Sequence, residues 1–140
     1  MGDADCFHIS LRNDLSELAR VNVSVHQFLE PDRASSQALY RLDLAIEELL
    51  TNIIKYGYDD ANPHEVSLTL RLLPEHLVLT IEDDGHEFNP VRSATPDLGQ
   101  APEDRKTGGL GLHMVREMSD KMEYWRRNGR NVVQVTIRRS

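Results

Sequence analysis

The spacing of hydrophobic positions changes several times along the chain, and each change predicts a new element of secondary structure. Residues 6–11 alternate apolar with polar, which is typical of a half-buried strand. From 15 to 29 apolar residues recur every three or four positions, which predicts a helix that Pro31 ends. A second helix is predicted from about 35 to 56, where Gly57 stops it.

Strand patterns dominate the second half of the chain. Residues 65–73 and 76–82 alternate on either side of a short turn, which predicts a hairpin. A final hairpin is predicted from 122–125 and 132–137, because Asn128-Gly129 between them is a strong signal for a tight type I′ turn. Strands that follow one another so closely favour antiparallel pairing.

Two further segments lie between these hairpins. Residues 86–107 lack periodicity and contain several prolines, which predicts a loop of about 20 residues that is either a lid or a disordered insertion. Residues 110–122 return to helical spacing. We therefore expect a single domain, 1–140, of the α+β class: a two-layer sandwich in which a mainly antiparallel or mixed sheet is covered on one face by helices.

Composition limits the partners and the location. The net charge of -7 opposes binding to nucleic acid, and no apolar run reaches the roughly 18 residues of a membrane span. Cys6 is the single cysteine and residues 1–5 are acidic rather than signal-like, so a cytoplasmic location is expected. A basic group near the end is interpreted as a solvated strand face rather than a docking surface for an acidic protein: Arg126, Arg127, Arg130, Arg138 and Arg139.

The second predicted helix carries polar residues at helical spacing. Glu48, Asn52 and Lys55 are four and three positions apart, so they share one face beside the apolar stripe. The amide oxygen of Asn52 suits Mg²⁺ together with nucleotide phosphates. Glu48 lies one turn away, where it is the candidate base for a group that attacks a phosphate. A solvated helix face would contain the same residues, and that alternative stays open at this point.

The segment after the strand at 76–82 offers a site for a base. Asp83 presents a carboxylate that accepts a hydrogen bond from the exocyclic amine of adenine, and Gly85 lets the backbone approach the ring. An ordinary turn after a strand would also contain an aspartate and a glycine. The pair is therefore a weak signal until other segments join it.

Glycines open the third predicted helix. Gly108, Gly109 and Gly111 allow a close backbone approach, and the first turn of the helix offers free N–H groups to phosphates. The run lacks both the Lys-Ser/Thr ending of a P-loop and the spacing of a dinucleotide fingerprint. Arg105 and Lys106 precede it, either as partners of the terminal phosphate or as surface charges of the lid.

The ordered set of these segments resembles the GHKL ATPase superfamily. Ile-Glu-Glu-Leu-Leu-Thr-Asn-Ile-Ile-Lys-Tyr-Gly-Tyr looks like its N box, and Asp-Asp-Gly-His-Glu-Phe-Asn-Pro and Gly-Leu-Gly-Leu-His-Met-Val-Arg look like its two glycine boxes. The short form, without a phosphoacceptor-histidine helix, is similar to the anti-sigma-factor serine kinases of bacterial partner-switching systems. The likeness covers nearly the whole chain.

This resemblance implies a role for each matching residue. It makes Glu48 the general base, Asn52 the Mg²⁺ ligand, and Asp83 and Gly85 the adenine contacts. It places Gly109, Leu110 and Gly111 at the phosphates of ATP. The remaining nucleotide-binding residues that it implies are Lys55, Phe88, Arg105, Lys106 and Leu112, with an ATP lid at about 86–108.

The resemblance also implies partners. It predicts a homodimer that sequesters a sigma factor and phosphorylates a serine on a small antagonist protein, with ATP and Mg²⁺. Two alternatives remain at this stage: a non-catalytic, nucleotide-gated binding switch, and the same kinase acting on a target other than a sigma factor. Both need the same adenine and metal groups, so the motifs do not separate them.

Overall fold

The structure is a computed structural model that describes residues 5–30, 32–92 and 109–140. Its helices and strands follow the order that the sequence predicts. They are β1 (Cys6–Arg12), η2 (Leu15–Glu17), α1 (Leu18–Leu29), α2 (Ser36–Tyr56), β2 (Glu65–Leu72), β3 (His76–Asp83), α3 (Gly109–Met118), β4 (Lys121–Arg127) and β5 (Arg130–Arg138).

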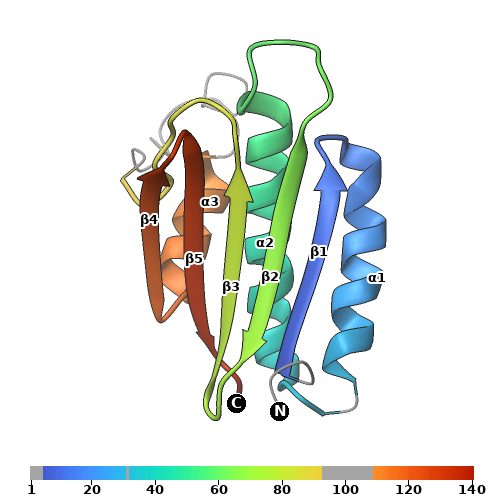
Figure 1. Ribbon diagram of the computed structural model, residues 1–140. Coiled ribbons are helices and arrows are strands. Elements are labelled where there is room, and N and C mark those ends of the chain that lie inside the picture. Colours follow the sequence, from blue (N-terminus) through green and yellow to red (C-terminus); the bar gives the residue numbers. More distant parts are fainter. Residues whose placement is uncertain (1–4, 31, 93–108) are drawn as a thin grey trace.

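The strands form one sheet in the order β1-β2-β3-β5-β4, and every neighbouring pair is antiparallel. All three α-helices lie on the same face of this sheet (Figure 1). The α+β class with helices on one face is therefore confirmed. Because β3 and β5 are neighbours at the centre of the sheet, residues that end β3 lie beside residues that begin β5.

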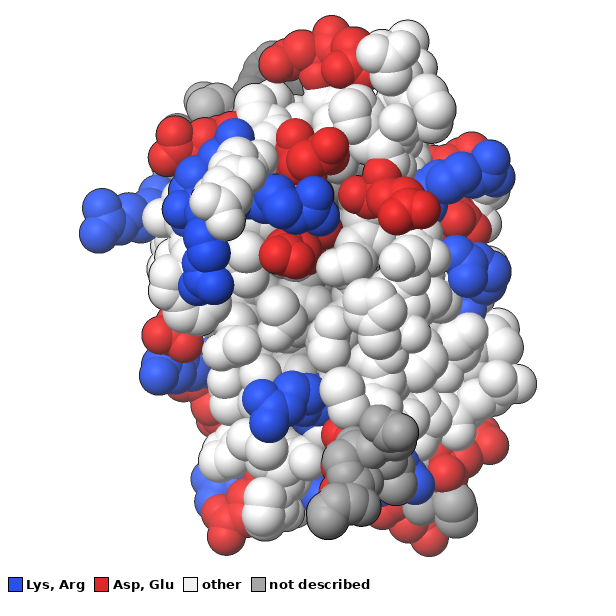
Figure 2. Space-filling model, viewed as in Figure 1, with Lys and Arg blue, Asp and Glu red and all other residues white. Residues whose placement is uncertain are grey.

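The other face of the sheet is uncovered. Its central positions carry short polar side chains, and neighbouring strands pair them: Thr69 lies opposite Thr80, and Thr80 opposite Gln134. Figure 2 shows uncharged side chains over the middle of this face and charged ones toward its ends. The two faces thus follow the alternation of the strands, polar outward and apolar toward the helices.

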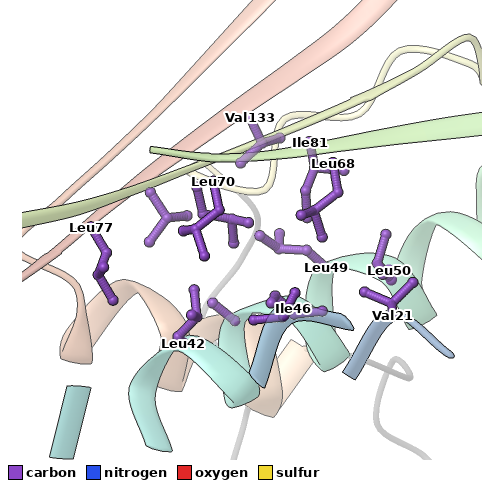
Figure 3. Packing of buried hydrophobic residues seen from close by; sticks show 14 of the residues in the cluster. Val21, Leu42, Ile46, Leu49, Leu50, Leu68, Leu70, Leu77, Ile81 and Val133 are labelled. Atoms are coloured by element: carbon purple, nitrogen blue, oxygen red, sulfur yellow. The ribbon is translucent and has the colours of Figure 1, made fainter. Parts of the chain in front are cut away.

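The core lies between α2 and the middle strands. Leu42, Ile46 and Leu49 on α2 point toward Leu68 and Leu70 on β2, and all five side chains are buried (Figure 3). Burial of each such side chain stabilises the fold by about 1.5–3 kcal/mol. This packing fixes the rotation of α2, so the polar side chains next to its apolar stripe face the end of β3.

Both ends of α2 are set by local hydrogen bonds. The hydroxyl of Ser35 accepts a hydrogen bond from the N–H of Ala38 at 3.0 Å, as an N-cap does. At the other end Gly57 N donates to the carbonyl of Ile53 at 2.8 Å. The predicted bounds of this helix are confirmed to within one residue.

Two predicted helix bounds are wrong. The predicted helix at 15–29 begins with the separate 3₁₀ turn η2, and the helix predicted at 110–122 ends at Met118. Asp120 explains the second difference, because its N–H donates to Thr136 O at 2.9 Å and its carboxylate accepts from Arg138 N at 2.7 Å. These bonds attach Asp120 to the sheet, and Met122 consequently lies in β4.

The last hairpin turns where the sequence predicts. Asn128 and Gly129 both have positive φ, 53° and 75°, as a type I′ turn requires. The turn places Arg126 on β4 opposite Asn131 on β5. Among the described residues, no helix is long and apolar enough to cross a bilayer.

Candidate functional site

A cleft opens between the C-terminal half of α2, the end of β3, the loop that follows it and the start of β5. About 480 Å³ of space not filled by atoms lies within it, including the solvent at its open mouth. Three of the predicted site residues, Asn52, Asp83 and Phe88, meet in its wall. The lining residues are Leu49, Asn52, Ile53, Tyr56, Gly57, Asp83, His86, Phe88, Pro90, Asn131 and Val133.

Asp83 is the buried acceptor of this cleft. It ends β3 and is 3% exposed. Gly85 N donates to its Oδ1 at 2.8 Å, and Asn131 Nδ2 donates to the same oxygen at 3.0 Å. Burial raises the pKa of this carboxyl, and the two hydrogen bonds oppose that rise. Since the described residues donate only to Oδ1, Oδ2 can accept a hydrogen bond from a ligand amine.

Gly85 fits tightly against the end of α2. A Cβ on this residue would overlap the carbonyl oxygen of Gly57 and would lie 3.0 Å from Asp83 Oδ1. The next residue, His86, donates its N–H to the same Gly57 carbonyl at 2.9 Å. A glycine is therefore needed here for close packing, and the turn is held beside the cleft in one position.

Asn131 is a site residue that the sequence reasoning missed. Its Nδ2 donates to Asp83 Oδ1 and to the carbonyl of His86, at 3.0 and 2.9 Å. The side chain thus joins β3 to the loop after it and fixes the orientation of the Asp83 carboxylate. The sequence contained a signal for this role: Asn131 is a polar residue in the series of alternate positions on β5 that face the core. The other residues of that series, Val133, Val135 and Ile137, are apolar.

Two residues of β4 hold Asn131 in turn. Tyr124 Oη donates to Asn131 Oδ1 at 2.6 Å, and Arg126 donates to the same oxygen at 3.0 Å. Arg126 also donates to the carbonyl of Gly85 at 2.9 Å. Arg126 is exposed, as the prediction of a solvated strand face requires, and its guanidinium also binds the turn at Gly85.

Glu48 lies one helical turn before Asn52 and contacts the third helix. A Cβ placed on Gly111 would overlap the Glu48 carboxylate, so the two helices touch at this point. Burial raises the pKa of Glu48, the nearby charge of Glu47 adds to that rise, and Lys55 opposes it. A partly desolvated carboxylate has a higher proton affinity than an exposed one, which suits a base.

The other predicted residues lie around this cleft or outside the described part. Lys55 is exposed on α2, and Gly109 and Leu110 form the first residues of α3. Leu112 is 2% exposed and belongs to the core, so only its backbone remains for a ligand. Arg105 and Lys106 lie outside the described residues, as does most of the predicted lid. The roles of all these residues stay predictions.

A metal would have few charged ligands here. Among the described residues, no group of three or more His, Cys, Asp or Glu side chains is placed to hold an ion. Asn52, whose side chain lines the cleft, offers a neutral amide oxygen. Such a donor set fits Mg²⁺ that takes most of its remaining ligands from phosphates and water, and does not fit a protein-only metal cage.

The one-sided α+β sandwich and its cleft, with a buried carboxylate beside a glycine turn, define the class of GHKL-type ATP-binding domains. Comparison with known families agrees. The chain matches the family described as Histidine kinase-like ATPase domain over residues 11–137, and it belongs to that family.

Relatives of known activity are protein kinases and an anti-sigma factor. The chain is 31% identical to the serine/threonine-protein kinase BtrW of Bordetella bronchiseptica over 105 residues, which cover 75% of this chain and 74% of the relative. It is 23% identical to the anti-sigma F factor of Clostridium novyi, with 79% of each chain covered. The serine-protein kinase RsbW of Listeria monocytogenes is 24% identical, with 71% of this chain and 66% of the relative covered. The chain is accordingly assigned to the serine/threonine-protein kinases of this family.

A solved structure supports the fold. The crystal structure of the RsbU and RsbW domains of a Mycobacterium tuberculosis protein superimposes with a TM-score of 0.64 and covers 95% of this chain. The identity is 16%, and the present chain corresponds to 32% of the solved one. At that identity the likeness establishes the fold alone.

Proposed function

We propose that this protein is an anti-sigma-factor kinase that phosphorylates a serine on a small antagonist protein and sequesters a sigma factor. The observation that carries the proposal is the buried Asp83, whose Oδ2 is left for a ligand within the same cleft as Asn52. The names of the relatives, serine-protein kinase and anti-sigma F factor, support the choice of substrate and partner.

Adenine binds, in this proposal, at the inner end of the cleft. Its exocyclic amine donates to Asp83, and the ring lies beside the Gly85 turn, which its packing against Gly57 holds in place. Phe88, which is 36% exposed at the cleft wall, offers an apolar surface to the nucleotide. Leu49 and Val133 continue that surface inward to the core.

The phosphates extend from there toward α3 and the Asn52 amide. The first N–H groups of α3, at Gly109, Leu110 and Gly111, point their dipoles at the phosphate oxygens, and Lys55, Arg105 and Lys106 add positive charge. Asn52 holds Mg²⁺. When bound, the metal neutralises charge on the phosphate oxygens.

The transfer step needs one proton acceptor. The serine hydroxyl oxygen forms a bond to the γ-phosphorus while the bond from that phosphorus to the β,γ-bridging oxygen breaks. ADP leaves with the electron pair of the broken bond, and the serine proton passes to the Glu48 carboxylate. The raised pKa of Glu48, which results mainly from burial, makes it a better acceptor than an exposed glutamate.

The test compares the wild-type chain with Glu48→Gln, using Glu117→Gln as a control that makes the same chemical change at an exposed position of α3. Each tagged variant is incubated with Mg-ATP and a lysate of the source organism, and mass spectrometry identifies bound proteins and new phosphoserines. We expect Glu48→Gln to bind ATP normally and to transfer phosphate at least about 100-fold more slowly than the wild type. We expect Glu117→Gln to transfer normally.

Each outcome of this experiment has a stated meaning. A retained sigma factor and a phosphorylated small protein with the wild type support the kinase switch. Retained partners without new phosphate favour a nucleotide-gated binder, and a different phosphorylated target redirects the kinase to another system. If Glu48→Gln transfers phosphate as fast as the wild type, Glu48 is not the general base.

We also propose that the protein acts as a homodimer. The resemblance to the anti-sigma-factor serine kinases motivates this expectation, and sedimentation velocity measures it. The chain has a mass of 16.0 kDa, so a dimer sediments as a particle of twice that mass, whereas a monomer at micromolar concentration contradicts the proposal.

A further inference from the structure

The helix that carries the proposed base packs against the helix proposed to bind phosphates, and Glu48 meets Gly111 within that contact. Glu48 lies in the middle of α2, and Gly111 is the third residue of α3. A Cβ on Gly111 would overlap the Glu48 carboxylate and would lie 2.9 Å from Glu48 Cγ. The glutamate side chain therefore fills the space that any larger residue at position 111 would need.

This contact differs from the close approach at Gly85. There the atoms nearest to a Cβ include the backbone of Gly57, whereas at Gly111 the three nearest atoms belong to the side chain of Glu48. A methyl group at position 111 would therefore move Glu48 before it moved the fold. The side chain of Glu48 is also the group whose position decides whether a proton can be accepted.

We propose that Gly111 is a positioning residue for Glu48, and that its missing side chain determines where the catalytic carboxylate lies. This inference rests on the proposed kinase function. Because α3 begins at the proposed phosphate site and meets Glu48 two residues later, the same helix contacts both the phosphates and the base in this proposal.

A glycine at this position also suits close approach of phosphate to the backbone, and the two roles predict different kinetics. Loss of phosphate approach raises the KM for ATP. Loss of carboxylate position lowers kcat and leaves ATP binding intact, because the base takes part only in the transition state. The split between kcat and KM therefore distinguishes them.

The first experiment measures single-turnover transfer and ATP affinity for Gly111→Ala, with Glu117→Ala as the control on the exposed side of α3. We expect Gly111→Ala to keep its ATP affinity and to lose about 100-fold in transfer rate, as a displacement of a catalytic group by about 1 Å does. The control keeps both quantities. A loss of ATP affinity with normal single-turnover transfer at saturating ATP would overturn the proposal.

A shorter acid provides a rescue test. Glu48→Asp alone retracts the carboxylate by one methylene and lowers the transfer rate. In the double variant Gly111→Ala with Glu48→Asp, the overlaps at the Glu48 Oε1 and Cδ positions are relieved and a close approach at Cγ remains. We therefore expect transfer faster than in Gly111→Ala. Multiplicative losses in the double variant would mean that the two positions act independently, contrary to the proposal.

A spectroscopic measurement separates this inference from the proposed activity. NMR of carboxyl-labelled protein follows the titration of Glu48, assigned by its absence in Glu48→Gln. In the wild type burial and Glu47 raise the pKa of Glu48 while Lys55 lowers it. If the methyl displaces Glu48 toward solvent, its pKa falls in Gly111→Ala, even if the wild type transfers no phosphate. An unchanged titration means that Gly111 does not position Glu48.

Discussion

Asn131 shows how much of the site depends on a residue that does not belong to any recognised box. Its Nδ2 donates to the buried Asp83, and its Oδ1 accepts from Tyr124 and Arg126. A side chain with both a donor and an acceptor is required, because it joins a carboxylate on one side to a hydroxyl and a guanidinium on the other. A buried network of this kind is stable only when every member has its partner.

Replacing Asn131 with alanine removes both the hydrogen bond to Asp83 and those from Tyr124 and Arg126. We expect Asn131→Ala to lower the free energy of unfolding by about 1–3 kcal/mol, because Asp83 and Tyr124 lose partners in a buried environment. We also expect ATP affinity to fall by about tenfold or more, since Asp83 is no longer oriented. Urea denaturation and calorimetric titration with ADP measure the two effects.

The matched control is Gln134→Ala on the same strand. Gln134 donates to Thr80 Oγ1 at 3.2 Å on the uncovered face of the sheet, away from the cleft. A small change in stability and normal ADP binding are expected for it. If Asn131→Ala binds ADP as tightly as the wild type, Asn131 does not orient the acceptor.

At the scale of the elements, the periodicity of apolar residues predicted the type and approximate position of nearly every helix and strand. The alternation in β2 and β3, the stripe of α2 and the turn at Asn128-Gly129 each required only local sequence. The end of α3 was missed because Asp120 leaves the helix for bonds to β5, which lies far along the chain. Tertiary hydrogen bonds override local spacing at such positions.

The candidate site was predictable to the extent that it lies on one helix or at one strand end. Spacing put Asn52 on a polar helix face and Asp83 at a strand end, and the resemblance to the GHKL ATPases joined them in one site. The structure brings both to the same cleft. The role of Asn131 depends on the neighbour relation of β3 and β5, which alternation does not reveal. The contacts of Arg126 could not be predicted either, because its partner Asn131 lies on the neighbouring strand β5.

The loop between α2 and β2 closes over the Asp84-Gly85 turn through His64. The imidazole lies 2.9 Å from a carboxylate oxygen of Asp60 and 3.3 Å from one of Asp84, and it stacks on Tyr58 with ring centroids 4.1 Å apart. The hydrogen bond to Asp60 and the further bond to Asp84 raise the pKa of His64 above its ordinary value. The protonated ring thus holds two acids from different elements.

This contact predicts a pH-dependent stability. A pKa that is raised in the folded state stabilises it below the unfolded value of about 6.5, and the contribution is lost as the pH rises through the folded pKa. We therefore expect His64→Gln to lower the melting temperature more at pH 6 than at pH 8. His8→Gln, on the uncovered face of the sheet, is the control. A deficit that is equal at both pH values would show that His64 acts by packing alone.

At the scale of the whole molecule, the cleft is lined by elements that are distant in sequence and lie at the centre of the fold. Its walls come from α2, β3 and β5, and these elements also contribute most of the core. A ligand that binds only the folded state therefore stabilises the whole domain and not a local loop. Unfolding of the entire chain is then a direct measure of occupancy.

The base that occupies this cleft can be identified by the same measurement. At 100 times its dissociation constant a ligand adds about 2.7 kcal/mol to the free energy of unfolding, which raises the melting temperature of a domain this size by about 5–10 °C. We expect that shift with Mg-ADP. We expect little with Mg-GDP, because guanine has a carbonyl acceptor where adenine has an amine donor, and Asp83 offers another acceptor there.

Asp83→Asn completes the argument. The amide is nearly the same size and removes a buried charge whose pKa is raised by desolvation, so the fold is expected to remain stable without ligand. Its carbonyl oxygen keeps the bonds from Gly85 and Asn131, which turns the amide nitrogen, a donor, toward the base. The shift with Mg-ADP should then disappear. If Mg-ADP raises the melting temperature of this variant as much as that of the wild type, the base does not bind at Asp83.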